Sequence, residues 1–239
     1  MSRIAIVAAL EREVRPLIKG WRVSQKEADG RRFRFFEQGN SVVVCAGIGA
    51  EAARRAAEAV IAVYAPTVIY SAGFAGALDP TLKVGDVVQP RKVVNANDGS
   101  SVNFEHGEGV LVSFGSVASP AQKMSLRDSF GAQAVDMEAA AVARSAEARG
   151  AAFAAVKVIS DEFDFSFPSM ERFVDSNGQF LEGRFARFTA LRPWLWTRVA
   201  RLGRNSHRAS IALCERLRKV MDATSVSSNV PTEEAVNRR

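Results

Sequence analysis

Carboxylate side chains occur at three places in the 239-residue chain where an apolar run begins or ends. Glu11 and Glu13 come directly after the first apolar run. Glu138 opens an alanine-rich run, and Asp161 follows a run of β-branched residues. Carboxylates can bind hydroxyl groups, activate water or donate a proton, according to their surroundings. Acidic residues also favour the start of a helix through its dipole, so for Glu11 and Glu13 both interpretations stay open.

Two predicted elements hold Glu138 and Asp161 in place. Strong helix formers recur at helical spacing from Glu138 to a stop at Gly150. Residues 153–159 are apolar and β-branched, which is typical of a buried strand in a parallel sheet. Ser160 and Asp161 then lie at the carboxyl end of that strand, where open α/β sheets bind ligands.

The rest of the amino-terminal part alternates predicted strands and helices. Gly39 and Asn40 indicate the turn of a hairpin. Strands are predicted for residues 3–9, 32–38, 41–46, 67–70 and 110–114, helices for 10–17, 50–63 and 120–129, a turn and strand for 82–88, and a polar loop for 95–109.

Two glycine-containing stretches follow predicted strands. Gly47 and Gly49 precede the second helix, where backbone N–H groups could face an anion or a sugar. A tight strand-to-helix turn explains this pair equally well. Small residues from Ser71 to Ala77 likewise indicate a close approach of the backbone to a neighbour or ligand.

Composition favours one α/β domain with appendages, since 47% of the residues are hydrophobic and 24% are charged. Two cysteines and two histidines predict neither a disulfide framework nor a metal site. With no signal peptide or membrane span in view, we expect a cytoplasmic protein. We divide the chain into a domain at 1–180, basic helices packed on it at 181–222, and a disordered tail at 223–239.

The net charge of +6 is concentrated near the carboxyl end, because residues 184–219 alone carry +9. A helical pattern runs from 180 to 202 with a break near Pro193, and resumes at 207–221. Its apolar residues lie near one face with arginines around them. This composition suits a helix drawn to the anionic inner face of a membrane, or a helix packed on the domain or on another subunit.

Five segments together resemble the nucleoside phosphorylase superfamily, and its methylthioadenosine/S-adenosylhomocysteine nucleosidase branch looks closest. They are IAIVAALEREV, VVVCAGIGAEAA, SAGFAGALDPTLKVGDVV, AVDMEAAAVA and VKVISDEFD. The resemblance implies a three-layer α/β/α sandwich around a mixed, partly closed β-sheet, here with extra carboxyl-terminal helices. It also implies a homodimer or larger assembly, no cofactor, and cleavage of the N-glycosidic bond of a purine nucleoside.

Site roles follow from the same resemblance. Asp161 would protonate the leaving purine, Glu138 would bind the ribose hydroxyls beside Met137, and Glu13 would activate water. Further substrate contacts are implied for Ser160, Phe74, Gly73, Ala72, Val135 and Asp136. An acid that stays protonated needs apolar surroundings or a neighbouring carboxylate, and we expect Phe163 and Phe165 to supply the former.

The nucleophile is left open between water and phosphate as a co-substrate. In phosphorolytic relatives, an arginine and a serine hold phosphate at the positions of Ser71 and Phe74, so the guanidinium is missing here. Phosphate could still bind Arg12, Arg15 or the backbone of Gly47 and Gly49. The sequence therefore favours hydrolysis without excluding phosphorolysis.

Residues 119–141 and 192–210 look similar to a bacterial subgroup, the hopanoid-associated phosphorylases. That similarity implies a lipid-linked nucleoside, adenosylhopane, as the substrate, with adenine as a product.

Two other functional classes remain as alternatives. One is a basic nucleic-acid-binding protein, for which no recognition motif is present. The other is a non-catalytic nucleoside binder, against which the three carboxylates Glu13, Glu138 and Asp161 argue.

Overall fold

The computed structural model describes residues 3–165, 170–173, 175, 178 and 180–227. Its strands are β1 Ile4–Ala8, β2 Arg22–Ala28, β3 Arg31–Gln38, β4 Ser41–Cys45, β5 Val68–Ala77, β6 Val87–Val88, β7 Lys92–Asn95, β8 Ser101–Asn103, β9 Val110–Ser113, β10 Ala134–Asp136 and β11 Ala152–Asp161. Its helices are α1 Glu11–Ile18, α2 Ala50–Tyr64, α3 Pro120–Phe130, α4 Ala139–Glu147, α5 Glu182–Ala190 and α6 Trp196–Ser227, with 3-10 turns η1 Met170–Phe173 and η2 Pro193–Leu195.

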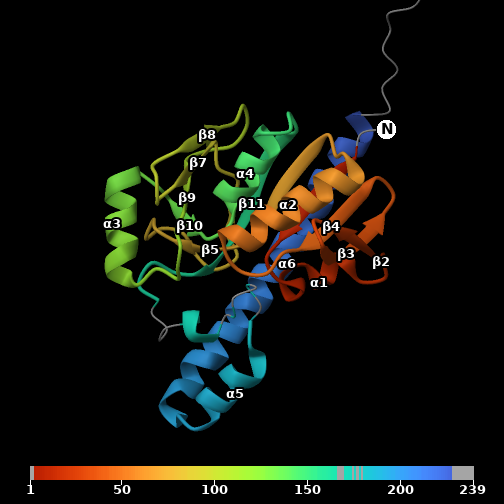
Figure 1. Cartoon of the computed structure of the whole chain (residues 1–239). Coiled ribbons are helices and arrows are strands. Elements are labelled where there is room, and N and C mark those ends of the chain that lie inside the picture. The colour runs from red at the N-terminus through yellow and green to blue at the C-terminus, as the bar shows by residue number, and fades with distance from the viewer. Residues whose placement is uncertain (1–2, 166–169, 174, 176–177, 179, 228–239) are drawn as a thin grey trace, which may run out of the picture.

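One mixed sheet forms the centre of the molecule (Figure 1). Strand β1 runs parallel to both β4 and β5, and β11 runs parallel to β5 on its other edge. At Gly76 and Ala77, β5 pairs with β10 in the antiparallel sense, and β10 in turn runs parallel to β9. Strand β5 is therefore the strand at which the sheet branches.

Helices cover both faces of the sheet around β1. Ala5 and Val7 pack toward α2 and α4, whereas Ile4 and Ile6 pack toward α1 and α6. This alternation follows from the two-residue period of a strand, and both sets are apolar because both faces are covered. The layers confirm the predicted α/β/α sandwich around a mixed sheet.

The last helix departs from its prediction. A break was expected between residues 202 and 207, but α6 is one continuous helix of 32 residues. Its carboxyl-terminal half packs on α1 and β11, while its amino-terminal half forms with α5 and η2 an arm that projects from the body (Figure 1). The helix continues through Ser227, and the rest of the predicted disordered tail lies outside the described residues.

Two strands also differ from expectation. Strand β2 was missed because its side chains are mostly exposed and polar, and it pairs with β3 about a turn at Asp29 and Gly30. Strand β5 was predicted to end at Tyr70 but runs on to Ala77. Its small residues allow neighbouring side chains to approach the strand closely. A methyl group added at Gly76, for example, would lie 2.9 Å from Oδ2 of Asp161. The predicted loop at 95–109 contains the short strand β8.

The packing of α6 makes a testable prediction. Leu213 is fully buried against the sheet, whereas Ile211 on the same helix is 40% exposed. Leu213→Ala should lower the free energy of unfolding by about 2–5 kcal/mol, because it removes buried methyl groups and leaves a cavity. Urea denaturation of this variant and of the control Ile211→Ala measures the difference. Equal losses in the two variants would contradict the packing described.

Candidate active site

A cavity of about 370 Å³ opens at the carboxyl ends of β1, β5, β10 and β11. Most of the residues singled out from the sequence line it. These are Asp161, Glu13, Glu138, Met137, Ser160, Phe74, Val135, Asp136, Arg12 and Gly49. The parallel strands β1, β5 and β11 bring their carboxyl ends to one edge, so segments far apart in the chain meet there.

Four predicted residues lie behind the cavity wall. Ala72 is buried in the core beside α1 and α6. Gly73 lies against Glu13, since an added methyl would be 3.0 Å from Oε2 of that carboxylate. Gly47 donates its N–H to the Ala9 carbonyl at 2.8 Å. Ser71 is buried, and its hydroxyl has no hydrogen-bond partner among the described residues.

Glu138 is fixed by backbone donors from two elements. It is the residue before α4, and its Oε1 accepts a 2.8 Å hydrogen bond from the N–H of Gly49 at the start of α2. Its Oε2 accepts a longer bond of 3.3 Å from the N–H of Met137. Burial raises the pKa of Glu138 and the nearby Asp136 raises it further, while Lys157 opposes them. The glycine turn thus orients a carboxylate at the cavity wall.

Asp136 was predicted to contact the substrate, but both of its carboxylate oxygens are bonded within the protein. Its Oδ1 accepts a 2.6 Å hydrogen bond from the Ser113 hydroxyl, and its Oδ2 accepts one of 2.8 Å from the N–H of Ala139. Lys157 lies 2.8 Å from the same Oδ2 in a fully buried ion pair. Burial lowers the pKa of Lys157, but Asp136 and Glu138 outweigh burial and raise it. Lys157 was not predicted as a site residue, because it stands inside an apolar strand.

Glu13 is buried at the start of the chain's first helix, and its Oε2 has no hydrogen-bond partner among the described residues. Burial raises its pKa to about 8, and the charge of Glu138 adds to this effect, whereas Lys157 and Arg12 act against it. A carboxyl group with this pKa exchanges its proton near neutral pH, as a general base must. Its unpartnered oxygen also has room for a hydrogen bond from water or substrate.

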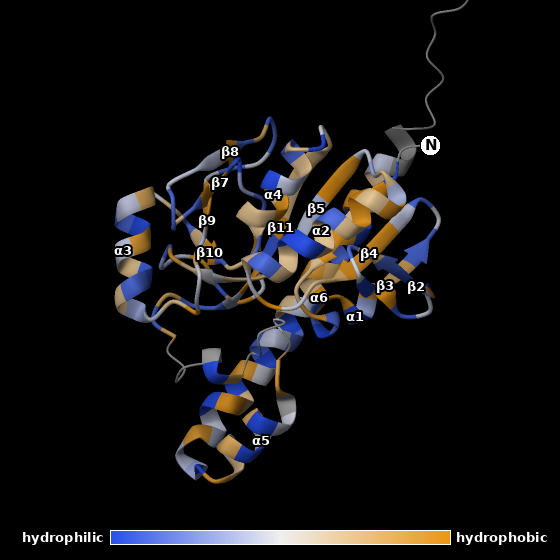
Figure 2. Ribbon diagram, in the orientation of Figure 1, coloured by the Kyte–Doolittle hydropathy of each residue, from blue (hydrophilic) through white to orange (hydrophobic). Residues whose placement is uncertain are grey.

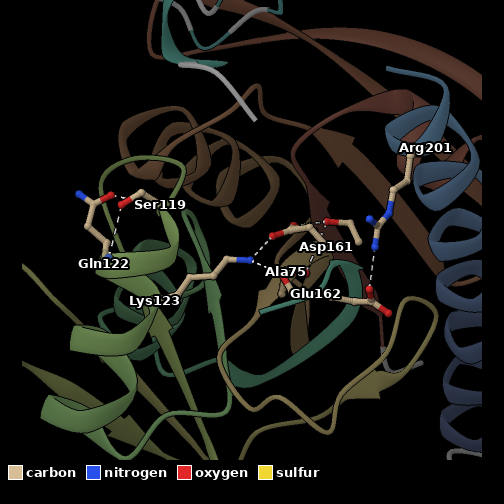
Figure 3. A network of polar contacts seen from close by, with 8 residues as sticks. Ala75, Ser119, Gln122, Lys123, Asp161, Glu162 and Arg201 are labelled. Carbon is tan, nitrogen blue, oxygen red and sulfur yellow. Dashed lines mark hydrogen bonds and ion pairs between the residues drawn. The ribbon is translucent and has the colours of Figure 1, made fainter. Parts of the chain in front are cut away.

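Asp161 has a cationic neighbour rather than the predicted apolar one. Its Oδ2 lies 2.5 Å from Nζ of Lys123, and its Oδ1 accepts a 2.9 Å hydrogen bond from the Ser160 hydroxyl (Figure 3). Phe163 and Phe165 do not line the cavity.

Two further parts of the wall were not anticipated. Residues 115–118, which follow β9, form one of them. Phe180 forms the other, and its ring stacks under the Arg12 guanidinium at 5.0 Å. Nothing in the local pattern pointed to either segment. Across the described ranges, no three His, Cys, Asp or Glu side chains gather as a metal-ligand cluster.

The pKa of Glu13 predicts how stability depends on pH. In the folded protein Glu13 holds its proton up to about pH 8, against an ordinary value of 4.5. The folded state therefore binds more protons than the unfolded state between these values, and the free energy of unfolding falls as pH rises through this window. The upper bound of this contribution is on the order of 5 kcal/mol.

Glu13→Gln should flatten that slope in urea denaturation measured at several pH values between about 4.5 and 8. Glu11→Gln serves as the control, because the Glu11 carboxylate is half-exposed and pairs with Arg34. It should leave the slope in place. A slope that is unchanged in Glu13→Gln would show that Glu13 is not the proton-holding group.

Comparisons with known proteins agree with this geometry. The 5′-methylthioadenosine/S-adenosylhomocysteine nucleosidase of Staphylococcus aureus strain JH9 is 27% identical over 222 residues, covering 75% of this chain and 97% of its own. The same enzyme from Neisseria meningitidis, in complex with methylthio-immucillin-A, superposes with a TM-score of 0.70 at 19% identity, covering 93% of this chain and 100% of its own. Futalosine hydrolase of Helicobacter pylori superposes with a TM-score of 0.69, also at 19% identity, covering 93% of this chain and 98% of its own.

The two structural likenesses show the shared fold. A family description, Phosphorylase superfamily, matches residues 3–115 and 100–191, which is more than half of the sequence. With its branched sheet and its carboxylate-lined cavity, the chain belongs to the phosphorylase superfamily.

Proposed function

We propose that this protein hydrolyses the N-glycosidic bond of an adenine-type nucleoside. One observation carries the proposal: a single cavity wall holds three carboxylates, Glu13, Glu138 and Asp161, in three different environments. The names of the relatives, nucleosidases and a futalosine hydrolase, support the same class of reaction.

Bond breaking leaves positive charge on the sugar, and this requirement assigns the carboxylates. The oriented Glu138 binds the ribose hydroxyls and places negative charge near the developing cation. Glu13 in its ionised form, with an oxygen that has no hydrogen-bond partner among the described residues, takes a proton from the attacking water. Asp161, which lies beside Gly76 whereas Glu13 lies beside Gly73, serves the leaving base. Three separate strands set the spacing of these carboxylates, because β1 precedes Glu13, β10 precedes Glu138, and Asp161 is the last residue of β11.

Charge favours water over phosphate as the nucleophile. Glu138 raises the pKa of Glu13, and Asp136 raises the pKa of Glu138, so these acids lie close together and in their ionised forms would repel a phosphate dianion. Arg12 is the cation nearest to Glu13 on the wall, but its guanidinium stacks on Phe180. The buried hydroxyl of Ser71 lies behind the wall rather than on it. Phosphorolysis is therefore the second candidate within this class.

Apolar side chains line the part of the cavity that the carboxylates leave free. Leu10, Ile48, Val117 and Phe180 contribute to this part. We propose that it receives an apolar 5′ substituent, and the resemblance to hopanoid-associated enzymes makes adenosylhopane the specific candidate. A homodimer or larger assembly stays a prediction from the family.

Adenine release tests the proposed reaction. We expect the purified protein to release adenine from adenosine, 5′-methylthioadenosine or a long-chain 5′-alkyl adenosine without phosphate, and to yield the free sugar. Glu13→Gln should lower kcat by about 10²–10⁴, because it removes the group that activates water. Glu11→Gln should retain activity.

Chromatography of the products separates the outcomes. Release that requires phosphate and gives a sugar 1-phosphate would establish phosphorolysis instead. Failure to release a base from any of the three nucleosides would overturn the proposed function.

A membrane-facing role for the arm is a second proposal, carried by its surface. Leu191, Trp194 and Trp196 are 70%, 71% and 57% exposed at the end of the arm, where hydrophobic and hydrophilic residues alternate (Figure 2). No helix within the described ranges is both long and apolar enough to span a bilayer. Partial insertion of these side chains at a membrane surface would bury them without a span.

Cations lie further along the same helix. A hollow of about 470 Å³ between α6 and the segment before β6 is lined by Lys83, Arg201, Arg204 and Arg208, with Glu162 as its acidic member. Arg204 follows Trp196 by about 12 Å along the helix axis. Aromatic residues at the level of the acyl chains and arginines at the level of the phosphates suit an anionic lipid surface. We therefore propose that the arm docks on anionic bilayers.

Vesicle co-sedimentation tests this docking. Trp194→Ser with Trp196→Ser should abolish binding to vesicles that contain phosphatidylglycerol, and high salt should weaken binding of the unchanged protein. Met124→Ser, which alters a side chain of 55% exposure on α3, should have no effect. Equal binding to neutral vesicles, or salt-sensitive binding to random DNA without binding to vesicles, would contradict lipid docking.

A further inference from the structure

The leaving-base end of the cavity contains a buried lysine that the reaction scheme has not used. Lys123 lines the cavity, yet its side chain is only 2% exposed. Its Nζ lies 2.5 Å from Oδ2 of Asp161 and donates a second hydrogen bond of 2.7 Å to the carbonyl of Glu162 (Figure 3). In the described part of the chain, Asp161 is its only ion-pair partner.

Local sequence fixes this lysine firmly. Helix α3 starts with a capping box in which Ser119 and Gln122 bond each other's backbone N–H groups. Lys123 is in the turn that follows, and its own N–H bonds the Ser119 carbonyl at 2.8 Å. Gly76 provides the space for the pair, since an added methyl would lie 3.3 Å from Cε of Lys123. The ammonium is therefore held in place before any substrate arrives.

The ion pair limits what Asp161 can do. A carboxylate in an ion pair accepts hydrogen bonds and has no proton to give. Asp161 already accepts from Lys123 and from the Ser160 hydroxyl. The ring nitrogens of a leaving purine are hydrogen-bond acceptors, and an ionised carboxylate offers them no donor. The ammonium of Lys123 is the donor that this end of the cavity supplies.

Resting on the proposed nucleoside cleavage, we propose that Lys123 is the catalytic acid that protonates the departing base, with Asp161 holding it in position. The bond between the sugar C1′ and the base nitrogen breaks, and its electron pair moves into the purine ring. A ring nitrogen takes a proton from Nζ of Lys123. The amine left behind remains hydrogen-bonded to the Asp161 carboxylate and regains a proton from solvent after adenine leaves.

The competing explanation is that Lys123 only anchors the Asp161 side chain. Substrates with different leaving groups distinguish this structural role from the role of a catalytic acid. Adenine needs a proton to depart, whereas 4-nitrophenolate departs as a stable anion. Loss of a catalytic acid therefore slows the release of adenine alone, whereas loss of a structural anchor slows the release of both adenine and 4-nitrophenolate. Arginine offers a second distinction, because it keeps a positive charge but does not release a proton.

The experiment compares Lys123→Met and Lys123→Arg with the unchanged protein on an adenine nucleoside and on 4-nitrophenyl riboside. We expect both variants to lower kcat for adenine release by about 10²–10⁴ and to cleave the nitrophenyl riboside within about threefold of the unchanged protein. Arg127→Met, which removes an exposed cation one turn along the same helix, is the matched control and should behave as the unchanged protein.

Three results would overturn the proposal. They are equal losses on both substrates, restoration of adenine release by Lys123→Arg, and adenine release by Lys123→Met within about threefold of the unchanged protein. Circular dichroism of each variant shows whether it is folded. If the unchanged protein itself cleaves neither substrate, the proposed function fails first, and that result is distinct from a loss confined to the variants.

Discussion

The buried ion pair between Lys157 and Asp136 is the interaction on which the cavity depends. It joins β11 to β10 at 2.8 Å, with both side chains excluded from solvent. Ser113 and the N–H of Ala139 bond the same aspartate, so β9 and α4 are attached to it as well. An unpaired charge at this depth would be strongly destabilising, whereas a paired and fully hydrogen-bonded one can be tolerated. The pair therefore sets the distance between the strands that bear the other functional groups.

The same lysine controls the ionisation of its neighbours. Burial raises the pKa values of Glu13 and Glu138, and the charge of a neighbour adds to this effect, Glu138 acting on Glu13 and Asp136 acting on Glu138. Lys157 opposes both effects because its charge lies among three acids. A cluster with one buried cation among several carboxyl groups has a proton to exchange near neutral pH. This property is what separates a reactive cavity from a fully satisfied structural network.

Much of the fold could be predicted because it depends on local patterns. Alternating apolar runs and glycine turns located β1, β4, α2 and β11, and they placed Glu138 and Asp161 at the ends of elements. Lys157 and Lys123 could not be found this way, since their partners lie 21 and 38 residues away and a single lysine hardly changes an apolar pattern. Sequence similarity implied that Asp161 is an acid, but the cation beside it comes from α3 and is brought there only by the tertiary fold.

The contact between α1 and α6 affects how the chain folds during synthesis. The Ser210 hydroxyl on α6 donates a 2.9 Å hydrogen bond to the Glu13 carbonyl, and Leu213 and Leu217 close the face of the sheet behind α1. These residues leave the ribosome long after Glu13, because about 200 residues separate them. Until they emerge, the first helix has no cover and the buried state of Glu13 cannot form. The buried environment that raises the pKa of Glu13 is therefore completed only after α6 has been synthesised.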